Sequence, residues 1–295
     1  MRILIIGASG FIGRYLSRRL GAMPGHEVFC TFRSRPPGDD RNHWYQVELT
    51  DPVRVEKLFG AIHPEMVVHL AALADVGTAE REPERARAVN VAATAEIVRQ
   101  CDWYGARLLF VSTEYVFDGR RGLYREDDPP HPTTQYGRTK LAAELEVARL
   151  GSRASVLRTS IVYGWPEPGS RNFVPWLIDR LQGGETYAGA AQVMRSPIYV
   201  EQLVEGIVGL VMRDHSGVNH VAGGDWVSMY EFARAIAAAF GLDQNLVVPK
   251  DDQTANPDRL GLDSTRTLKK VGLERLELAD GLAAMRESPN NPFAG

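Results

Sequence analysis

The sequence predicts an α/β protein: a Rossmann-type doubly wound parallel sheet with a smaller, mostly C-terminal substrate-binding domain. Three observations predict it. Short apolar runs alternate with helix-length segments in the first half, a glycine-rich turn follows the first run, and the alternation loosens after Gly164. Continuous apolar strands between helices imply a parallel sheet covered on both faces. The handedness of the crossovers then favours double winding.

The expected elements follow in chain order. Apolar runs predict strands at Arg2–Ile6, Glu27–Phe32, Met66–Leu70, Arg107–Ser112 and Ala154–Arg158. Helical patterns between them predict helices at Phe11–Leu20, Asp51–Ile62, Pro83–Tyr104 and Tyr136–Leu150. The second half predicts helices at Phe173–Leu181, Val200–Arg213 and Met229–Phe240, a connector over Gln182–Gln192 and a strand at Val218–Ala222. Residues 1–164 are expected to form the sheet domain, with 197–225 returning to it, and residues 165–295 the smaller, discontinuous domain.

Composition excludes several classes of protein. The 295 residues carry a net charge of −3, which argues against a dedicated binder of nucleic acid or anionic membranes. No apolar run approaches the roughly 18 residues that span a bilayer, and the run before Gly7 is too short for a signal peptide. Cys30 and Cys101 are expected to be small buried hydrophobic residues, as in a reducing compartment. These features predict a cytoplasmic protein.

The glycine-rich turn predicts a dinucleotide site. Gly7, Gly10 and Gly13 follow the first strand and open the first helix, with Ser9, Phe11 and Ile12 between them. Glycine permits the tight turn, the approach of a pyrophosphate and close helix–strand packing, while the helix N-terminus offers N–H groups to phosphate. A glycine-rich turn without a ligand is the alternative. The domain of residues 1–164 is therefore expected to bind NAD(P).

Residues after the next strands refine the cofactor. Arg33 and Ser34 end the second strand with no acidic residue before Asp39, which favours a ribose 2′-phosphate and NADP(H), with NAD as the alternative. Arg33 and Arg35 could instead solvate a surface loop. Glu48 and Leu49 are expected beside the adenine, with Thr50 or Asp51 as a helix cap. The segment Ala71, Ala72 and Leu73 follows the strand expected at Met66–Leu70 and would let the backbone pass close to the cofactor.

The catalytic residues are predicted from a strand end and the next helix. Ser112 and Thr113 stand at the end of the strand expected at Arg107–Ser112, and Tyr136 and Lys140 stand four residues apart on one helical face. A phenol is a poor acid near neutral pH unless a cation favours its anion, so Lys140 is expected to lower the pKa of Tyr136 and to hold the nicotinamide ribose. Thr113 can bond a substrate carbonyl.

These motifs resemble the extended short-chain dehydrogenase/reductases, and within them the dTDP-4-dehydrorhamnose reductase branch. The resemblance rests on the segments Gly7–Gly13, Ala71–Glu80, Asn90–Thr94, Ser112–Gly119, Tyr136–Glu144 and Leu157–Gly164. It implies an NAD(P)-dependent oxidoreductase acting on a CH–OH group, with Thr113, Tyr136 and Lys140 catalytic. Tyr136 would protonate a 4-keto oxygen as hydride arrives. It also implies cofactor contacts at Asn90 and Ser112, and substrate contacts at Glu114, Val116, Asn172 and Phe173.

Departures from the branch lie on the substrate side. Glu114 replaces the usual Asp, Val76–Glu80 lacks one carboxylate, and Ile161 replaces a common Trp. Arg195, before Ser-Pro-Ile-Tyr-Val, looks like the arginine that related enzymes direct at a substrate pyrophosphate; an interdomain salt bridge is its alternative role. The sequence also resembles the regulatory beta subunits of methionine adenosyltransferase at Phe32–Pro36, Tyr115–Gly119 and Arg195–Val200.

The prediction is therefore an NADP-dependent reductase of a nucleotide-activated keto-sugar. An NADP-binding regulatory subunit without catalysis and a nucleotide-sugar epimerase of the same family are the alternatives. A homodimer is an open expectation, and neither nucleic acid nor membrane is an expected partner. No metal is expected, because the histidines, including His63 and His69, lack metal-ligand spacing.

Overall fold

The computed structural model describes residues 1–34, 42–166, 172–213, 215–251 and 258–293, and its chain forms two compact units. Unit 1 comprises Met1–Val116, Pro129–Arg158 and Ile207–Asn219. Unit 2 comprises Phe117–Asp128, Thr159–Gly206 and His220–Gly295. Each unit is thus assembled from three separate stretches of chain.

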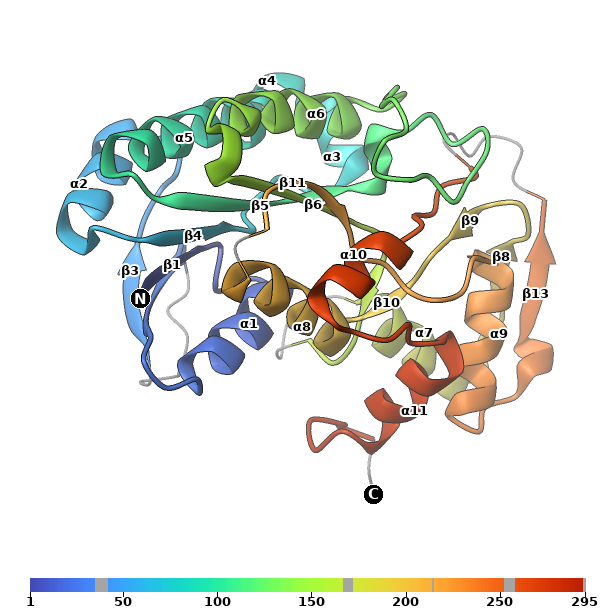
Figure 1. The fold of residues 1–295 in the computed structure, drawn as a ribbon. Helices are drawn as coiled ribbons and strands as arrows, with labels where there is room; N and C mark the ends of the chain where they lie inside the picture. Colours follow the sequence, from blue (N-terminus) through green and yellow to red (C-terminus); the bar gives the residue numbers. More distant parts are fainter. Residues whose placement is uncertain (35–41, 167–171, 214, 252–257, 294–295) are drawn as a thin grey trace. The chain divides into compact units, whose positions relative to one another are not determined.

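A seven-stranded sheet forms the centre of unit 1 (Figure 1). Its strand order is β3-β2-β1-β4-β5-β6-β11. The bounds are β1 Arg2–Ile6, β2 Glu27–Phe32, β3 His43–Gln46, β4 Met66–His69, β5 Arg107–Thr113, β6 Ala154–Thr159 and β11 Gly217–His220. The pairings β3–β2, β2–β1, β1–β4 and β4–β5 are parallel. The order 3-2-1-4-5-6 is that of a doubly wound dinucleotide-binding sheet, so the predicted fold class is confirmed.

Helices cover both faces of this sheet. In Figure 1, α2, α4, α5 and α6 lie on one face, and α1 lies on the other with the part of α8 that belongs to unit 1. Their bounds are α1 Phe11–Gly21, α2 Pro52–Ile62, α3 Val76–Arg81, α4 Pro83–Arg87, α5 Ala93–Tyr104, α6 Gln135–Ala148 and α8 Val200–Met212. Short 3-10 turns stand at η2 Glu114–Val116 and η3 Gly151–Arg153.

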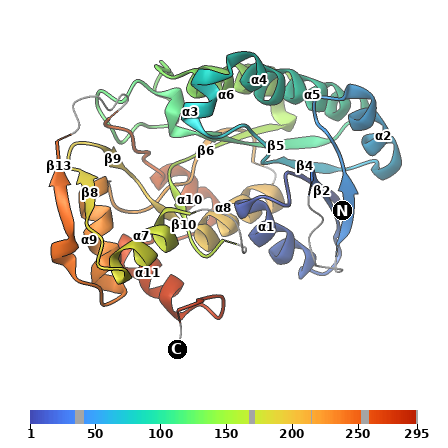
Figure 2. The same cartoon turned by 180° about the vertical axis from the view of Figure 1, so that it is seen from behind.

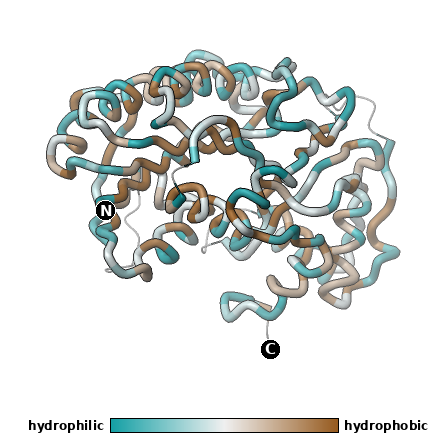
Figure 3. Tube along the Cα trace, in the orientation of Figure 1, coloured by the Kyte–Doolittle hydropathy of each residue, from teal (hydrophilic) through white to brown (hydrophobic). Residues whose placement is uncertain are grey.

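The core of unit 1 explains why the apolar runs form its strands. Ile3 to Ile6 are fully buried, as expected for strands covered on both faces, and Figure 3 shows the hydrophobic stretches along the central strands. Leu4 and Ile6 pack in one cluster with Phe59 of α2, Ile97 of α5 and Val147 of α6. The sheet is therefore held by helix faces whose apolar residues recur at helical spacing.

One helix differs from the expectation. The single helix predicted over Pro83–Tyr104 is interrupted by a π-helical turn, η1, at Ala88–Ala92. This turn carries Asn90, which is 1% exposed. A π turn inserts an extra residue into the helix and reorients its neighbours, and the hydropathy pattern does not reveal that insertion.

Unit 2 consists of helices and two-stranded sheets. The strands are β7 Val162–Tyr163, β8 Tyr187–Ala190, β9 Met194–Arg195, β10 Ile198–Tyr199, β12 Val227–Ser228 and β13 Val247–Lys250. The helices are α7 Phe173–Gln182, α9 Met229–Ala239, α10 Thr265–Val271 and α11 Leu278–Glu287, with a 3-10 turn, η4, at Gln244–Leu246. Figure 2 shows β8 beside β13, a parallel pair. The connector predicted over Gln182–Gln192 therefore contains a strand.

Two further expectations can be compared with the structure. Cys30 and Cys101 are both buried and unbridged, as predicted. Within the described ranges, none of the helices combines the length and apolarity that a membrane span requires.

Candidate active site

The glycine turn joins β1 to α1 and is shaped by close backbone contacts. Gly7 has φ +86°, and a Cβ there would lie 2.7 Å from the amide nitrogen of Ala71. A Cβ on Gly13 would lie 2.4 Å from the carbonyl oxygen of Gly7. The amide of Gly7 donates to the Thr31 hydroxyl at 3.0 Å. Glycine is therefore required at Gly7 and Gly13 by the packing of β1, α1 and the end of β4.

The N-terminus of α1 has no side-chain cap, and neither do the starts of α4, α10 and α11. Its N-cap is Gly10, which provides no side-chain hydrogen bond. By contrast, Asp51 caps α2, Thr134 caps α6, and Ser228 caps α9 in a capping box. A helix start without a side-chain cap leaves backbone N–H groups for an anion, as a dinucleotide phosphate site requires.

The expected contacts for the adenosine part follow neighbouring strands. Arg33 and Ser34 are exposed just after β2, and the backbone oxygen of Arg33 accepts a hydrogen bond from Gln46 at 2.9 Å. Arg35 lies outside the described residues. Glu48 accepts from the amide and hydroxyl of Thr50, at 3.4 and 3.1 Å. Leu49 lines a cavity of about 750 Å³ in unit 1.

Asn90 holds the segment that follows β4. Its Oδ1 accepts from the amide of Leu73 at 2.7 Å, and its Nδ2 donates to the Leu73 oxygen at 3.2 Å and to Thr139 at 3.0 Å. The Thr139 hydroxyl in turn donates to the backbone carbonyl oxygen of Tyr136 at 2.8 Å. Asn90 therefore ties the backbone of residues 71–73 to the helix that bears Tyr136.

Thr113, Tyr136 and Lys140 meet where β5 faces the start of α6. All three are buried, with exposed fractions of 7%, 8% and 2%. A side-chain hydrogen bond joins Thr113 to the Tyr136 phenol. Lys140 donates from Nζ to the Val111 oxygen at 2.8 Å and lies 3.8 Å from the centre of the Phe110 ring. The structure thus brings together the three residues that the sequence pattern selected.

The glycine after Tyr136 permits this contact. A Cβ on Gly137 would lie only 2.1 Å from the backbone carbonyl oxygen of Tyr115, so α6 can pack against η2 only with glycine there. The ring of Tyr136 meets the ring of Tyr115 edge-on, with centroids 5.8 Å apart. It also packs with Ala79 and Ala86 in a small cluster. The phenol is therefore fixed by apolar neighbours.

Burial opposes ionisation of both the Tyr136 phenol and the Lys140 amine. It raises the pKa of Tyr136 to about 12, although the Thr113 hydrogen bond lowers it and Tyr115 and Glu114 raise it. Burial also lowers the pKa of Lys140 to about 7, while the Glu144 carboxylate raises it. The phenol is thus a proton-holding acid, and Lys140 is not among the groups that shift its pKa.

His69, on β4, lies near Lys140. It is fully buried, and its Nε2 lies 3.1 Å from the Thr94 hydroxyl. Burial, with the nearby Lys140 cation, lowers its pKa to about 3, so the ring is neutral at physiological pH. No group of three or more His, Cys, Asp or Glu side chains gathers as a metal site among the residues described.

Three residues expected to contact ligand or substrate are deeply buried. Ser112, 3% exposed, donates to Glu144 at 2.5 Å. Glu114 is 1% exposed, and Val116 is fully buried, both in η2. The hydroxyl of Ser112 is thus directed at a carboxylate of α6, a role that the sequence pattern alone did not indicate.

In unit 2, the expected substrate residues have structural contacts of their own. Asn172 caps α7 by accepting from the Val174 amide at 3.3 Å, and it donates to the Val162 oxygen at 3.1 Å. The Phe173 ring packs with Phe232, with centroids 5.5 Å apart. Arg195, 5% exposed, donates to the backbone oxygens of Met194 and Asp258 at 2.7 and 3.1 Å.

A second arginine stands beside Arg195. Arg259 forms a parallel β-bridge with Met194, so the two arginines lie on paired segments. Its guanidinium lies 5.3 Å from the Trp226 ring centre. Arg259 was not predicted from the sequence, because its place beside Arg195 follows from the pairing of residues 194 and 259, which are far apart in the chain. Unit 2 also holds a cavity of about 610 Å³ lined in part by Arg125, Trp226 and Lys269.

Comparisons with known proteins identify relatives. The family model described as "RmlD substrate binding domain" matches residues 1–285. The chain is 32% identical over 283 residues to methionine adenosyltransferase 2 subunit beta of Xenopus tropicalis, covering 92% of this chain and 83% of that protein. It is 32% identical over 293 residues to the probable low-salt glycan biosynthesis reductase Agl14 of Haloferax volcanii, covering 97% of each.

A solved relative has the same fold along nearly its whole length. The dTDP-4-dehydrorhamnose reductase from Bacillus anthracis str. Ames, solved in complex with NADP, matches with a TM-score of 0.84 and 26% identity, covering 96% of each chain. The glycine turn, the strand order and the Thr–Tyr–Lys group agree with these relationships. The chain belongs to the RmlD substrate-binding-domain family.

Proposed function

We propose that this protein is an NADPH-dependent reductase that converts a ketone of a nucleotide-activated sugar to an alcohol. The observation that carries the proposal is the buried group at β5 and α6, where Thr113 bonds the Tyr136 phenol and Lys140 lies one helical turn further on. Cofactor binding alone does not require a buried proton donor beside a hydroxyl.

The glycine turn fits a dinucleotide. Two of its glycines leave no room for a Cβ, and α1 starts without a side-chain cap, so the backbone can approach a pyrophosphate. Arg33 is exposed after β2, where it would pair with a 2′-phosphate, and Ser34 would add a hydroxyl. Glu48, Leu49 and the segment 71–73 would border the adenosine. NADP complexation in the Bacillus anthracis relative supports this assignment.

The chemistry divides between cofactor and protein. When bound, NADPH supplies a hydride to the carbonyl carbon. Tyr136 holds its proton because burial raises its pKa to about 12, and it delivers that proton to the carbonyl oxygen as the hydride arrives. Thr113 donates a hydrogen bond to the same oxygen, which stabilises the developing negative charge. The carbonyl, the hydride of NADPH and the proton of Tyr136 become CH–OH, which leaves NADP⁺ and a Tyr136 phenolate that must then regain a proton, so the CH–OH group is the product of reduction.

Lys140 would bind the nicotinamide ribose and help to return a proton to Tyr136. Its Nζ is bonded to the Val111 oxygen, and its pKa of about 7 leaves it partly charged near neutral pH. Since Lys140 does not lower the pKa of Tyr136 in this structure, we assign the loss of the phenol proton to the moment of hydride transfer, when negative charge on the substrate oxygen attracts it.

Arg195 and Arg259 are the proposed contacts for a substrate diphosphate, because they are cations on paired segments of unit 2. Glu114, Val116, Asn172 and Phe173 stay candidate substrate residues. The 4-keto position and the 6-deoxyhexose follow from the resemblance to dTDP-4-dehydrorhamnose reductases. A homodimer and a cytoplasmic location also stay predictions.

The second candidate is a regulatory subunit that binds NADP without turnover. The 32% identity to a methionine adenosyltransferase beta subunit favours it. The two functions differ in NADPH oxidation. Purified protein should oxidise NADPH, followed by the loss of its absorbance, when given a panel of nucleotide-linked 4-keto-6-deoxyhexoses. Binding of NADPH without oxidation by any substrate of the panel would contradict the reductase proposal and favour a partner-binding role.

A further inference from the structure

A buried carboxylate stands one helical turn beyond Lys140. Glu144 is 6% exposed, and its side chain accepts from Arg158 at 3.0 and 2.7 Å and from the Ser112 hydroxyl at 2.5 Å. Arg158 lies on β6 and its side chain is 4% exposed. The carboxylate therefore links β5, β6 and α6 behind the candidate active site.

Three residues of α6, spaced four apart, form hydrogen bonds to the end of β5. Tyr136 is bonded to Thr113, Lys140 to the Val111 oxygen, and Glu144 to Ser112. The spacing of four residues on the helix places these side chains on one face, opposite consecutive strand positions. The Glu144 carboxylate is thus held in the same row as the two functional groups, with little freedom to move.

The charged and titratable groups around Lys140 are few. On its own helix, α6, Lys140 has Tyr136 and Glu144 as neighbours, and His69 faces it from β4. Two further charged groups act on these neighbours: Glu114 of η2 raises the pKa of Tyr136, and Arg158 of β6 pairs with Glu144. Burial lowers the pKa of Lys140, and Glu144 is the group that raises it. Since the His69 ring is neutral above a pH of about 3, it supplies no competing charge near neutral pH.

We propose that Glu144 is a positioning residue that keeps Lys140 charged, and that Arg158 moderates this effect by sharing the Glu144 carboxylate. The inference rests on the proposed function for its catalytic consequence, but the effect on Lys140 can be observed without turnover. A carboxylate in a buried site favours a nearby ammonium strongly, because the low dielectric screens their attraction weakly.

The direct test is a titration of Lys140. The chain has only five lysines, Lys57, Lys140, Lys250, Lys269 and Lys270, so ¹³Cε-lysine labelling gives a simple NMR spectrum that Lys140→Met assigns. In the wild type we expect a titration midpoint near pH 7 for Lys140. Glu144→Gln keeps the size and an acceptor for Ser112 but removes the charge, so the midpoint should fall by roughly one pH unit. Glu144→Asp, which restores the charge, should return it toward the wild-type value.

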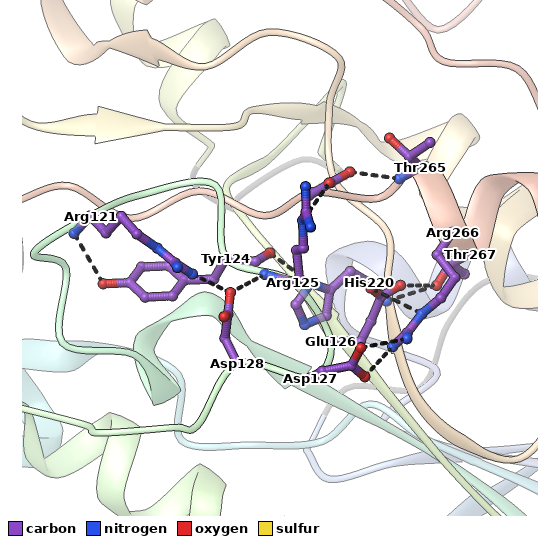
Figure 4. Close-up of polar contacts among 11 residues, drawn as sticks. Arg121, Tyr124, Arg125, Glu126, Asp127, Asp128, His220, Thr265, Arg266 and Thr267 are labelled. Carbon is purple, nitrogen blue, oxygen red and sulfur yellow. Dashed lines mark hydrogen bonds and ion pairs between the residues drawn. The ribbon is translucent and has the colours of Figure 1, made fainter.

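The chain contains a matched control in unit 2. Glu126 is also a buried carboxylate, with a side chain 4% exposed; it accepts from the Thr267 hydroxyl at 2.8 Å and pairs with Arg266 at 3.3 Å (Figure 4). Both partners, Arg266 and Thr267, belong to unit 2. Glu126→Gln should therefore lower the melting temperature without moving the Lys140 midpoint.

A second variant keeps the test decisive if Glu144→Gln does not fold. Arg158→Gln removes the cation that shares the carboxylate, so the Lys140 midpoint should rise. Opposite shifts in the two variants cannot come from general loosening of the fold. A Lys140 midpoint that moves in neither variant would overturn the proposal.

The pH–rate profile connects the titration to catalysis. With NADPH and an accepted keto-sugar, the basic limb of kcat/KM should move to lower pH in Glu144→Gln, by the shift seen in the titration. A limb that stays in place while the Lys140 midpoint moves would overturn the catalytic part. A wild type that oxidises no NADPH, combined with the expected titration shifts, would remove the reductase function and leave the effect of Glu144 on Lys140 established.

Discussion

Unit 1 and unit 2 both bury polar side chains, but those of unit 1 form the proposed catalytic group, whereas those of unit 2 bond to the backbone of their own unit. In unit 1, Thr113, Tyr136 and Lys140 lie at one strand end, where Lys140 donates to the Val111 oxygen and the Thr113 hydroxyl accepts from the Tyr115 amide at 3.2 Å. In unit 2, Asn172 caps a helix and Arg195 bonds two backbone oxygens of its own unit. The proposed catalytic group therefore lies in unit 1, while the substrate candidates of unit 2 also stabilise the fold of that unit.

This difference shows which part of a function a short motif can locate. The proposed catalytic residues come from one strand end and the first turns of one helix, so their spacing is fixed by local geometry. The substrate candidates come from α7, β9 and the segment before Leu260, whose approach depends on pairings such as Met194 with Arg259. Variants of the two units should consequently show different kinds of damage.

The largest expected effect is at Tyr136. Tyr136→Phe removes the proton donor but keeps the ring, so the rate of NADPH oxidation should fall by roughly 10²–10⁴-fold, while NADPH binding persists. Steady-state kinetics and NADPH fluorescence measure the two effects. Tyr115→Phe is the matched control: its ring packs edge-on against Tyr136, and its loss of a hydroxyl should cost less than about tenfold. Equal losses in both variants would contradict the role of Tyr136.

A smaller effect is expected at Arg33. If it pairs with the 2′-phosphate, Arg33→Ala should weaken NADPH binding by about 10- to 100-fold and leave NADH binding nearly unchanged. Calorimetric titration with both cofactors measures the ratio. Arg85→Ala, which removes another arginine of unit 1 from an exposed pair with Glu82, serves as the control. An unchanged preference in Arg33→Ala would assign Arg33 to the surface.

The smallest effect is expected at Asn172. Asn172→Ala removes the cap of α7 and should reduce the free energy of unfolding by about 1 kcal/mol, whereas Asn172→Ser, another capping residue, should retain most of it. Urea unfolding measures the difference. Equal stability of both variants, together with a raised KM for the sugar, would show that the side chain serves the substrate and not the helix.

The sequence predicted the sheet domain better than the substrate side. β1 and β2 begin and end as expected, because their residues are continuous apolar runs between turn signals. The Thr–Tyr–Lys group could be predicted because its members lie at recognisable positions on a strand end and a helix start. The π turn at Ala88–Ala92 was not found, since hydrophobic periodicity does not record an inserted residue.

Other features depend on contacts between distant residues. β8 and β13 are short strands that pair with each other across about sixty residues, so neither has a strong local pattern. Glu144 belongs to the recognised motif, but its bonds to Ser112 and Arg158 appear only when β5, β6 and α6 are assembled. Arg259 is similarly defined by its pairing with Met194.

The transfer of a labelled hydride tests the central claim most directly. With NADPH deuterated at C4 of the nicotinamide ring, on each face in turn, an accepted nucleotide-linked keto-sugar should gain one deuterium at its former carbonyl carbon for each labelled hydride consumed, as seen by NMR and mass spectrometry. Tyr136→Phe should bind the same NADPH and transfer almost none. Binding of NADPH by the wild type with no deuterium in any sugar of the panel would contradict the reductase account.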